Sequence, residues 1–164
     1  MIRLATIADL DRVDALAVRV IEHMATANIP QWTLAYPRKQ HYQNDVRNKA
    51  LFVYEQNNRI VGAFTILPEQ DPPYETIDGW LTNHGESLVI HRAIVDPNRE
   101  RSGVASTLMN HAFALARQGG FKSIKIDTHH DNYKMRNFLR KHGFRHIGYL
   151  AVIDREAYER LLED

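Results

Sequence analysis

The chain has 164 residues, a length that suits one domain with its own apolar core, so we expect a single domain over residues 1–164. Hydrophobic residues make up 44% and charged residues 25%, and a formal net charge of +1 gives no global field to attract nucleic acid or membrane. The chain has no cysteine, which excludes disulfides, a thiolate nucleophile and cysteine-bound metals. No apolar run approaches the roughly 20 residues that span a bilayer, and the N-terminus lacks a signal-peptide pattern, so we expect a cytoplasmic protein.

The first 67 residues predict a strand, two helices and a β-hairpin. The first helix follows from apolar side chains that recur at helical spacing. The hairpin follows from two apolar runs around Gln56-Asn57-Asn58, because asparagine tolerates the positive φ of a tight turn. These elements cover residues 2–4, 8–24, 38–48, 51–54 and 60–67, and a loop lies at 28–37.

A long stretch from residue 68 to residue 86 contains Pro72-Pro73 and Asp78-Gly79 and shows no helical or strand period. A loop of this length inside a compact domain is often functional. A plain insertion is the alternative interpretation.

The second half predicts a strand–helix–strand unit over residues 87–95, 103–118 and 121–127. Its two strands should be parallel neighbours with a right-handed crossover. A helix over 132–142 and a strand over 144–152 follow, and residues 156–162 fit either a strand or a helix. The pattern therefore predicts a mixed α/β fold around one central sheet.

The junction between the strand ending at residue 95 and the next helix has the features of an anion-binding cradle. The first N–H groups of a helix lack intrahelical acceptors, and its dipole adds positive potential there. Arginine adds charge with bidentate geometry, and small residues let a phosphate approach the backbone. Neither a P-loop nor a dinucleotide-binding glycine pattern is present, and a solvated basic helix start is the alternative. The candidate donors are Arg99, Arg101, Ser102, Gly103, Val104, Ala105 and Ser106.

Two motifs, in the correct order and spacing, resemble those of the GNAT acetyltransferase superfamily. The first is Val95-Asp96-Pro97 followed by Gly103-Val104-Ala105; the second consists of Asp131-Asn132, Met135, Phe138-Leu139 and Gly143-Phe144. The resemblance covers essentially the whole chain. It implies a mostly antiparallel mixed sheet with a splayed parallel strand pair and flanking helices, and an N-acyltransferase with acetyl-CoA as co-substrate.

The resemblance also implies where the coenzyme binds. Its pantetheine arm would pair with the backbone of Ala93, Ile94 and Val95, and an N–H there would polarise the thioester carbonyl. Asn132 matches the position that hydrogen-bonds the arm, and the same motif implies coenzyme contacts for Met135 and Phe138.

Two positions depart from the family pattern. The usual Arg or Gln that opens the loop is Glu100 here, so Arg99 or Arg101 must supply the positive charge. The Tyr that often serves as general acid falls on Leu139, which cannot donate a proton. Because thiols have a pKa of only about 8–9, a missing acid is tolerable, or Tyr133, His129, His130 or water replaces it.

Acetyl transfer to an amine also needs a base, because an alkyl ammonium has a pKa near 10. His91 is the first candidate, since it lies on the strand expected to carry the thioester and histidine titrates near working pH. A strand histidine with a satisfied hydrogen bond is the alternative. Glu86, Asp127 and Glu75 are further candidates, and Asp127 could instead pair with Arg92.

The run from Asp127 to Asp131 contains His129 and His130 and could suggest a metal site. No HExxH motif or second ligand cluster accompanies it, so we expect no metal and interpret the run as a substrate-facing edge. Aromatic residues in the loops predict a pocket lining or a cation–π wall for an amine, although they could simply cap the core. The substrate candidates are Trp32, Tyr36, Tyr74, Trp80, His91, Arg92 and His129.

These patterns favour an acetyl-CoA-dependent N-acetyltransferase that acts by direct attack on a primary amine of a small molecule or amino-acid derivative. A peptide N-terminus or lysine is a further option for the acceptor. A non-catalytic acyl-CoA-binding sensor or interaction domain is the rival hypothesis, to which Leu139 lends some support. A nucleic-acid-binding module is disfavoured by the neutral charge. A homodimer through the C-terminal strands is an option for which the sequence gives no direct evidence.

Overall fold

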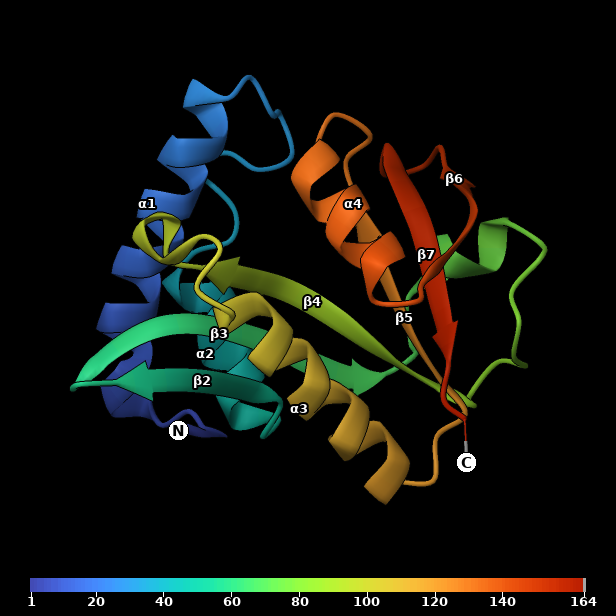
Figure 1. Ribbon diagram of the computed structural model, residues 1–164, viewed down its shortest axis with the longest axis horizontal. Coiled ribbons are helices and arrows are strands. Elements are labelled where there is room, and N and C mark those ends of the chain that lie inside the picture. The colour runs from blue at the N-terminus through green and yellow to red at the C-terminus, as the bar shows by residue number, and fades with distance from the viewer. Residues whose placement is uncertain (164) are drawn as a thin grey trace. The chain divides into compact units, whose positions relative to one another are not determined.

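The computed structural model describes residues 1–163 and contains both strands and helices (Figure 1). The strands are β1 (Ile2–Leu4), β2 (Leu51–Gln56), β3 (Arg59–Pro68), β4 (Ser87–Val95), β5 (Ser123–Thr128), β6 (Arg145–Leu150) and β7 (Arg155–Leu161). The helices are α1 (Leu10–Thr26), α2 (Lys39–Arg47), α3 (Val104–Gln118) and α4 (Tyr133–Lys141). Each element with a clear sequence period lies within a few residues of its expected position.

Two segments that the sequence described less well have defined structure. The C-terminal segment, which fitted either a strand or a helix, is strand β7, and it pairs with both β5 and β6. The long stretch before β4 includes a short 3-10 helix over Pro72–Thr76.

The sheet has the strand order β1-β2-β3-β4-β5-β7-β6. The pairs β1–β2, β2–β3, β5–β7 and β6–β7 are antiparallel, and β4–β5 is parallel. The parallel ladder joins only Ser87–Val89 of β4 to Ser123–Lys125 of β5, although both strands continue beyond it. The expected mixed, mostly antiparallel fold with a splayed parallel pair is therefore confirmed.

The chain groups into two compact units, each made of two separate segments. Unit 1 comprises residues 1–66 and 91–112, and unit 2 comprises residues 67–90 and 113–164.

In unit 1, helices cover both faces of β2 and β3. On one face α1 and α2 enclose an apolar cluster with the paired residues Val53 and Ala63 (Figure 1). On the other face, α3 packs so closely on β3 that a Cβ added to Gly62 would lie 2.7 Å from Leu108 Cδ1. A side chain at position 62 would therefore require the Leu108 side chain to shift where α3 crosses this strand.

In unit 2, the residues before β4 cover one face of the strands. Tyr74, Val89, Leu150 and Ala157 form a buried cluster, against which Trp80 packs.

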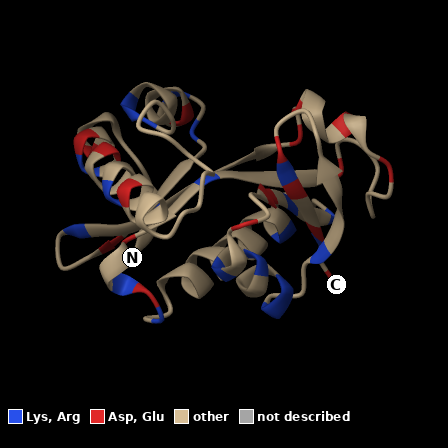
Figure 2. Cartoon of the chain, turned by 90° about the horizontal axis from the view of Figure 1, so that it is seen from above, with Lys and Arg blue, Asp and Glu red and all other residues tan. Residues whose placement is uncertain are grey.

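Charged side chains of both signs follow one another along the ribbon (Figure 2). This distribution matches the formal net charge of +1. No helix in residues 1–163 is both long and apolar enough to cross a membrane.

Candidate active site

The loop after β4 is anchored at its first residue, Asp96. Its backbone N–H donates to the carbonyl of Val61 on β3 at 2.8 Å. Its carboxylate accepts from the backbone N–H of Asn98 at 2.9 Å and pairs with Arg19 of α1 at 3.3 Å. A fixed loop start of this kind gives the following backbone amides a defined direction.

Left-handed residues shape the rest of the loop. Arg101 has a φ of 62° and Gly103 a φ of 85°, and α3 begins directly afterwards at Val104. Within this loop the Ser102 N–H donates to the Arg99 carbonyl at 3.3 Å, and the first amides of α3, which lack intrahelical acceptors, follow directly. No atom lies within 4 Å of the position that a Cβ on Gly103 would take, so the backbone is open to a ligand.

The charged side chains of the loop have separate partners. Arg99 donates to Gln56 Oε1 of β2 at 3.3 Å, whereas Arg101 is exposed. Glu100 lies 3.2 Å from His23 Nε2 of α1. The carboxylate at the position of the family's Arg or Gln thus contacts a side chain of α1.

In unit 1, the expected substrate residue Arg92 is engaged with a buried carboxylate. Its Nε and one terminal nitrogen donate to the two oxygens of Asp45, each at 2.7 Å. Its other terminal nitrogen donates to the hydroxyl of Tyr36 at 3.0 Å, and Tyr36 is 37% exposed. Trp32 is half-buried against the apolar cluster under α1. His91, which directly precedes Arg92 on β4, is half-buried.

A polar stripe on β5 was not recognised in the sequence. Ser123, Lys125 and Asp127 occupy alternate positions and therefore share one face. Ser123 donates to Glu159 of β7 at 2.6 Å, and Lys125 pairs with Glu69 at 2.7 Å. The alternation of isoleucine with these polar residues in a buried strand was the available signal.

Asp127, an expected catalytic residue, ends this stripe beside Tyr74. The Tyr74 hydroxyl donates to the Asp127 carboxylate at 2.7 Å. Burial and the adjacent carboxylate raise the pKa of Tyr74 well above its usual value, so the phenol stays a neutral donor. Tyr74 is only 1% exposed, and Trp80 stacks on it and donates to its backbone carbonyl at 2.7 Å. Tyr74 and Trp80 therefore pack on the apolar core, which is the alternative to a substrate-facing role.

The turn between β5 and α4 holds the second family motif. Asn132 is buried, and its side-chain oxygen accepts from the backbone N–H of Met135 at 3.2 Å, which caps α4. Leu139 is fully buried, whereas Tyr133 is 64% exposed. The two side chains therefore lie on different faces of α4. Phe138 is half-buried and contacts the ring of His142.

The histidine pair in this turn is held by hydrogen bonds and ion contacts. His129 Nδ1 accepts from the backbone N–H of Asp131 at 3.1 Å, so the ring proton lies on Nε2, which faces Asp154 at 3.3 Å. The rings of His129 and His130 are 4.1 Å apart and tilted by only 32°. The ligand atoms of His129, His130 and Asp131 lie within 4.8 Å of one another, so these residues could hold a metal ion, and the expectation of no metal stays a prediction.

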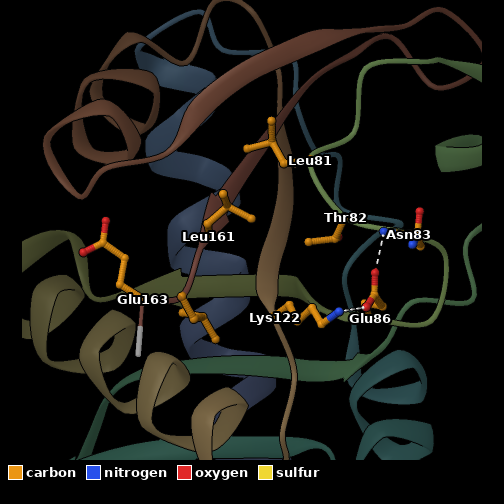
Figure 3. Close-up of a pocket in the computed structure, with 8 residues that line it drawn as sticks. Leu81, Thr82, Asn83, Glu86, Lys122, Leu161 and Glu163 are labelled. Atoms are coloured by element: carbon orange, nitrogen blue, oxygen red, sulfur yellow. Dashed lines mark hydrogen bonds and ion pairs between the residues drawn. The ribbon is translucent and has the colours of Figure 1, made fainter.

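Glu86 precedes β4, whereas the cradle follows it. Its carboxylate pairs with Lys122 and accepts from the backbone N–H of Asn83 at 2.9 Å, and these contacts lower the pKa of Glu86. The residue lines an open pocket of about 580 Å³ beside Leu81 and Leu161 (Figure 3). It is the one expected catalytic residue in this pocket.

The sequence was compared with models of known protein families. The sequence model of the Acetyltransferase (GNAT) family matches residues 17–144, which include the loop after β4 and the turn before α4. The chain belongs to the GNAT acetyltransferase family. The resemblance seen in its two motifs is thereby confirmed. No curated protein matches the sequence.

Solved structures share the fold of this GNAT family member over its full length. A GNAT-family acetyltransferase from Streptococcus agalactiae 2603 is 22% identical, with a TM-score of 0.89 and coverage of 100% of this chain and 96% of the other. A candidate acetyltransferase from Staphylococcus aureus Mu50 is 27% identical, with a TM-score of 0.78 and 99% of both chains covered. The PaiA N-acetyltransferase from Thermoplasma acidophilum, solved with coenzyme A, is 15% identical, with a TM-score of 0.76 and 98% of both chains covered.

Proposed function

We propose that this protein is an acetyl-CoA-dependent N-acetyltransferase whose acceptor is a primary amine of a small molecule or amino-acid derivative. The observation that carries the proposal is the loop between β4 and α3. It combines left-handed residues, an open backbone at Gly103, the first amides of a helix and an exposed arginine. These are the groups that bind a pyrophosphate.

The coenzyme sites follow the family motifs. The amides of Gly103, Val104, Ala105 and Ser106 would bind the pyrophosphate, and Arg101 would add charge. The pantetheine arm would lie along Ala93, Ile94 and Val95, with contacts to Asn132, Met135 and Phe138. Arg99 and Ser102 contribute to the loop itself, because Arg99 binds Gln56 and the Ser102 hydroxyl donates to the Arg99 carbonyl.

In the reaction, the neutral amine nitrogen attacks the thioester carbonyl carbon. A C–N bond forms, the C–S bond breaks, and the amine loses one proton to a base. The coenzyme leaves as a thiolate or takes up one proton as a thiol. Backbone N–H donors stabilise the oxyanion in between.

His91 and Asp127 are the candidates for the base. An imidazole titrates close to neutral pH and suits proton transfer there. A carboxylate held by the Tyr74 hydroxyl, as in Asp127, is a fixed acceptor that also attracts an ammonium. Tyr133, which is exposed at the start of α4, is the candidate for protonating the thiolate. Among the expected substrate residues, Tyr36 retains an exposed ring for an acceptor.

Calorimetric titration with acetyl-CoA tests the cradle. We expect the natural sequence to bind at micromolar concentration and Arg101→Glu to bind at least tenfold more weakly, because the substitution replaces an attractive charge with a repulsive one. Arg117→Glu, the same charge change in the last turn of α3, is the matched control and should bind like the natural sequence. Absence of binding by the natural sequence would remove the coenzyme assignment.

A non-catalytic acyl-CoA-binding domain is the second candidate, favoured by the buried Leu139 at the usual position of the acid. Release of free thiol from acetyl-CoA across a panel of primary amines separates the two. Amine-dependent release that saturates with one class of amine supports the enzyme. Binding of acetyl-CoA without release by any amine supports the sensor.

A further inference from the structure

Two turns of unit 2 bring two imidazoles and two carboxylates together. His129, His130 and Asp131 belong to the turn between β5 and α4, and Asp154 belongs to the turn between β6 and β7. His129 presents Nδ1 to Asp131 at 3.9 Å and Nε2 to Asp154 at 3.3 Å. His130 presents Nε2 to Asp131 at 3.5 Å and Nδ1 to Asp154 at 3.9 Å. Each imidazole therefore has one nitrogen toward each carboxylate.

This arrangement has the chemistry of a metal site on the side of Asp131. A histidine that binds a metal through one nitrogen usually donates the N–H of its other nitrogen to a carboxylate, which fixes the ring. The proton of His129 lies on Nε2, toward Asp154, so Nδ1 carries the lone pair that a metal needs. Asp154 is itself held by the Tyr149 hydroxyl, which donates to it at 2.5 Å. The ligand atoms would therefore be His129 Nδ1, His130 Nε2 and an oxygen of Asp131.

The distances within the cluster are close to those around a bound ion. Two ligand atoms that each lie about 2.0–2.1 Å from a tetrahedral Zn²⁺ are about 3.3 Å from each other. In the structure, one ligand atom from each of His129, His130 and Asp131 lies within 4.8 Å of the other two. The His129 side chain is 5% exposed, whereas those of His130 and Asp131 are 47% and 42% exposed. The two outer ligands can therefore move inward toward a fixed ring.

Binding of an ion has one local cost. His129 Nδ1 accepts a hydrogen bond from the backbone N–H of Asp131 at 3.1 Å, and an ion would take the same lone pair. Because this hydrogen bond must be given up, we expect moderate affinity. Three protein ligands leave the fourth position of a tetrahedral ion to water.

We propose that His129, His130 and Asp131 form a binding site for a divalent transition-metal ion, and specifically for Zn²⁺. Two imidazoles and a carboxylate suit Zn²⁺, whereas Mg²⁺ and Ca²⁺ prefer ligand sets made of oxygen. The sequence predicted no metal because no second cluster accompanied the histidines. The fold supplies Asp154 from a distant segment to support both rings. A bound ion would fix the turn that leads into α4, and the inference is independent of the proposed acetyl-CoA binding.

Calorimetric titration of the chelator-treated full chain with ZnCl₂ tests the site. We expect one Zn²⁺ per chain at micromolar concentration and no binding of Mg²⁺ under the same conditions. His130→Ala and Asp131→Ala each remove one exposed ligand and should weaken Zn²⁺ binding by about tenfold or more. His146→Ala is the matched control, because His146 is also an exposed histidine beside a carboxylate, at 2.8 Å from Glu156, but lies outside the cluster. It should bind Zn²⁺ like the natural sequence.

Asp154→Gly tests the role of the second carboxylate. Asp154 has a φ of 54°, which glycine adopts without penalty, so the substitution removes the carboxylate and keeps the turn. Loss of a group that orients a metal-bound histidine lowers metal affinity by about 10–100-fold, so we expect at least the lower end of this range. Free Zn²⁺ at about a hundred times its dissociation constant should also raise the melting midpoint of the natural sequence by about 5–10 °C, and that of His130→Ala by much less.

Absence of Zn²⁺ binding at millimolar concentration would overturn the proposal. Equal affinities of the natural sequence, His130→Ala and Asp131→Ala would also overturn it, because the ion would then be adventitious. The same holds if His146→Ala weakens binding as much as His130→Ala does. If Asp154→Gly alone binds like the natural sequence, the three ligands stand and the supporting role of Asp154 is wrong. A chain that binds acetyl-CoA but not Zn²⁺ keeps the proposed function and loses only this site.

Discussion

The buried ion pair between Lys125 and Glu69 gives the clearest prediction about stability. The two side chains are 1% and 3% exposed and their charged atoms lie 2.7 Å apart. Ser87 donates to the same carboxylate at 2.9 Å, and the ammonium lies 4.3 Å from the centre of the Trp80 ring. Because both side chains are buried, water cannot reach either charge, and each charge is stabilised by these protein partners instead.

Removal of one partner should be much more harmful than removal of both. Lys125→Met leaves a buried carboxylate that still accepts from Ser87 and lies 3.8 Å from the exposed ring of His84. Breaking a buried pair in this way costs about 3–5 kcal/mol, and loss of the cation–π contact adds to that cost. Glu69→Leu should cost a similar amount because it leaves the ammonium unpaired.

The double variant Lys125→Met with Glu69→Leu should lose only about 1 kcal/mol, since no charge remains to be buried and only the hydroxyl of Ser87 loses its partner. Urea unfolding at pH 7 of the natural sequence, both single variants and the double variant measures the coupling. A cost of the double variant equal to the sum of the single costs would refute the reasoning, as would single variants within about 1 kcal/mol of the natural sequence.

Three further predictions concern stability. Gly62→Ala should cost about 1–3 kcal/mol in urea unfolding, because its Cβ would displace the Leu108 side chain and lie only 3.2 Å from the Ile94 carbonyl oxygen. Burial lowers the pKa of His111, so its contribution to stability is complete above pH 6.5 and falls as the pH drops below that value. His111→Leu should flatten the decrease in unfolding free energy between pH 7 and pH 5, and an unchanged slope would contradict this assignment. Hydrogen bonds from Arg3 lower the pKa of Asp9. Asp9→Asn should therefore reduce the free energy of unfolding by about 2 kcal/mol at pH 7, and by progressively less as the pH falls below 4. Urea unfolding at pH 7 and at several values below pH 4 measures this difference.

Local sequence patterns were sufficient for the helices, for the strands up to β6 and for the position of the loop between β4 and α3. Apolar side chains at helical spacing define α1 and α3, and Gly103 after a buried strand signals the loop that precedes α3. These features depend on neighbours in the sequence, which a periodicity detects.

Features that depend on distant residues could not be predicted. Nothing in His-Arg-Ala indicates that Arg92 has a positive φ of 49°, because Asp45 and Tyr42, which bind it, lie about 50 positions earlier. Glu100 was expected to repel phosphate, but its contact with His23 joins residues 77 positions apart. Tyr74 looked like a loop aromatic, and only the fold places it under a carboxylate from β5.

The discontinuous composition of the two units has a consequence for synthesis of the chain. The boundaries at 66/67, 90/91 and 112/113 fall within β3, β4 and α3, so no single cut releases either unit as a continuous fragment. During translation, unit 1 cannot close until residue 112 has left the ribosome, and unit 2 must await β7. Sequence-distant pairing of this kind slows folding. The nascent chain should therefore remain sensitive to proteases until its last strand has emerged.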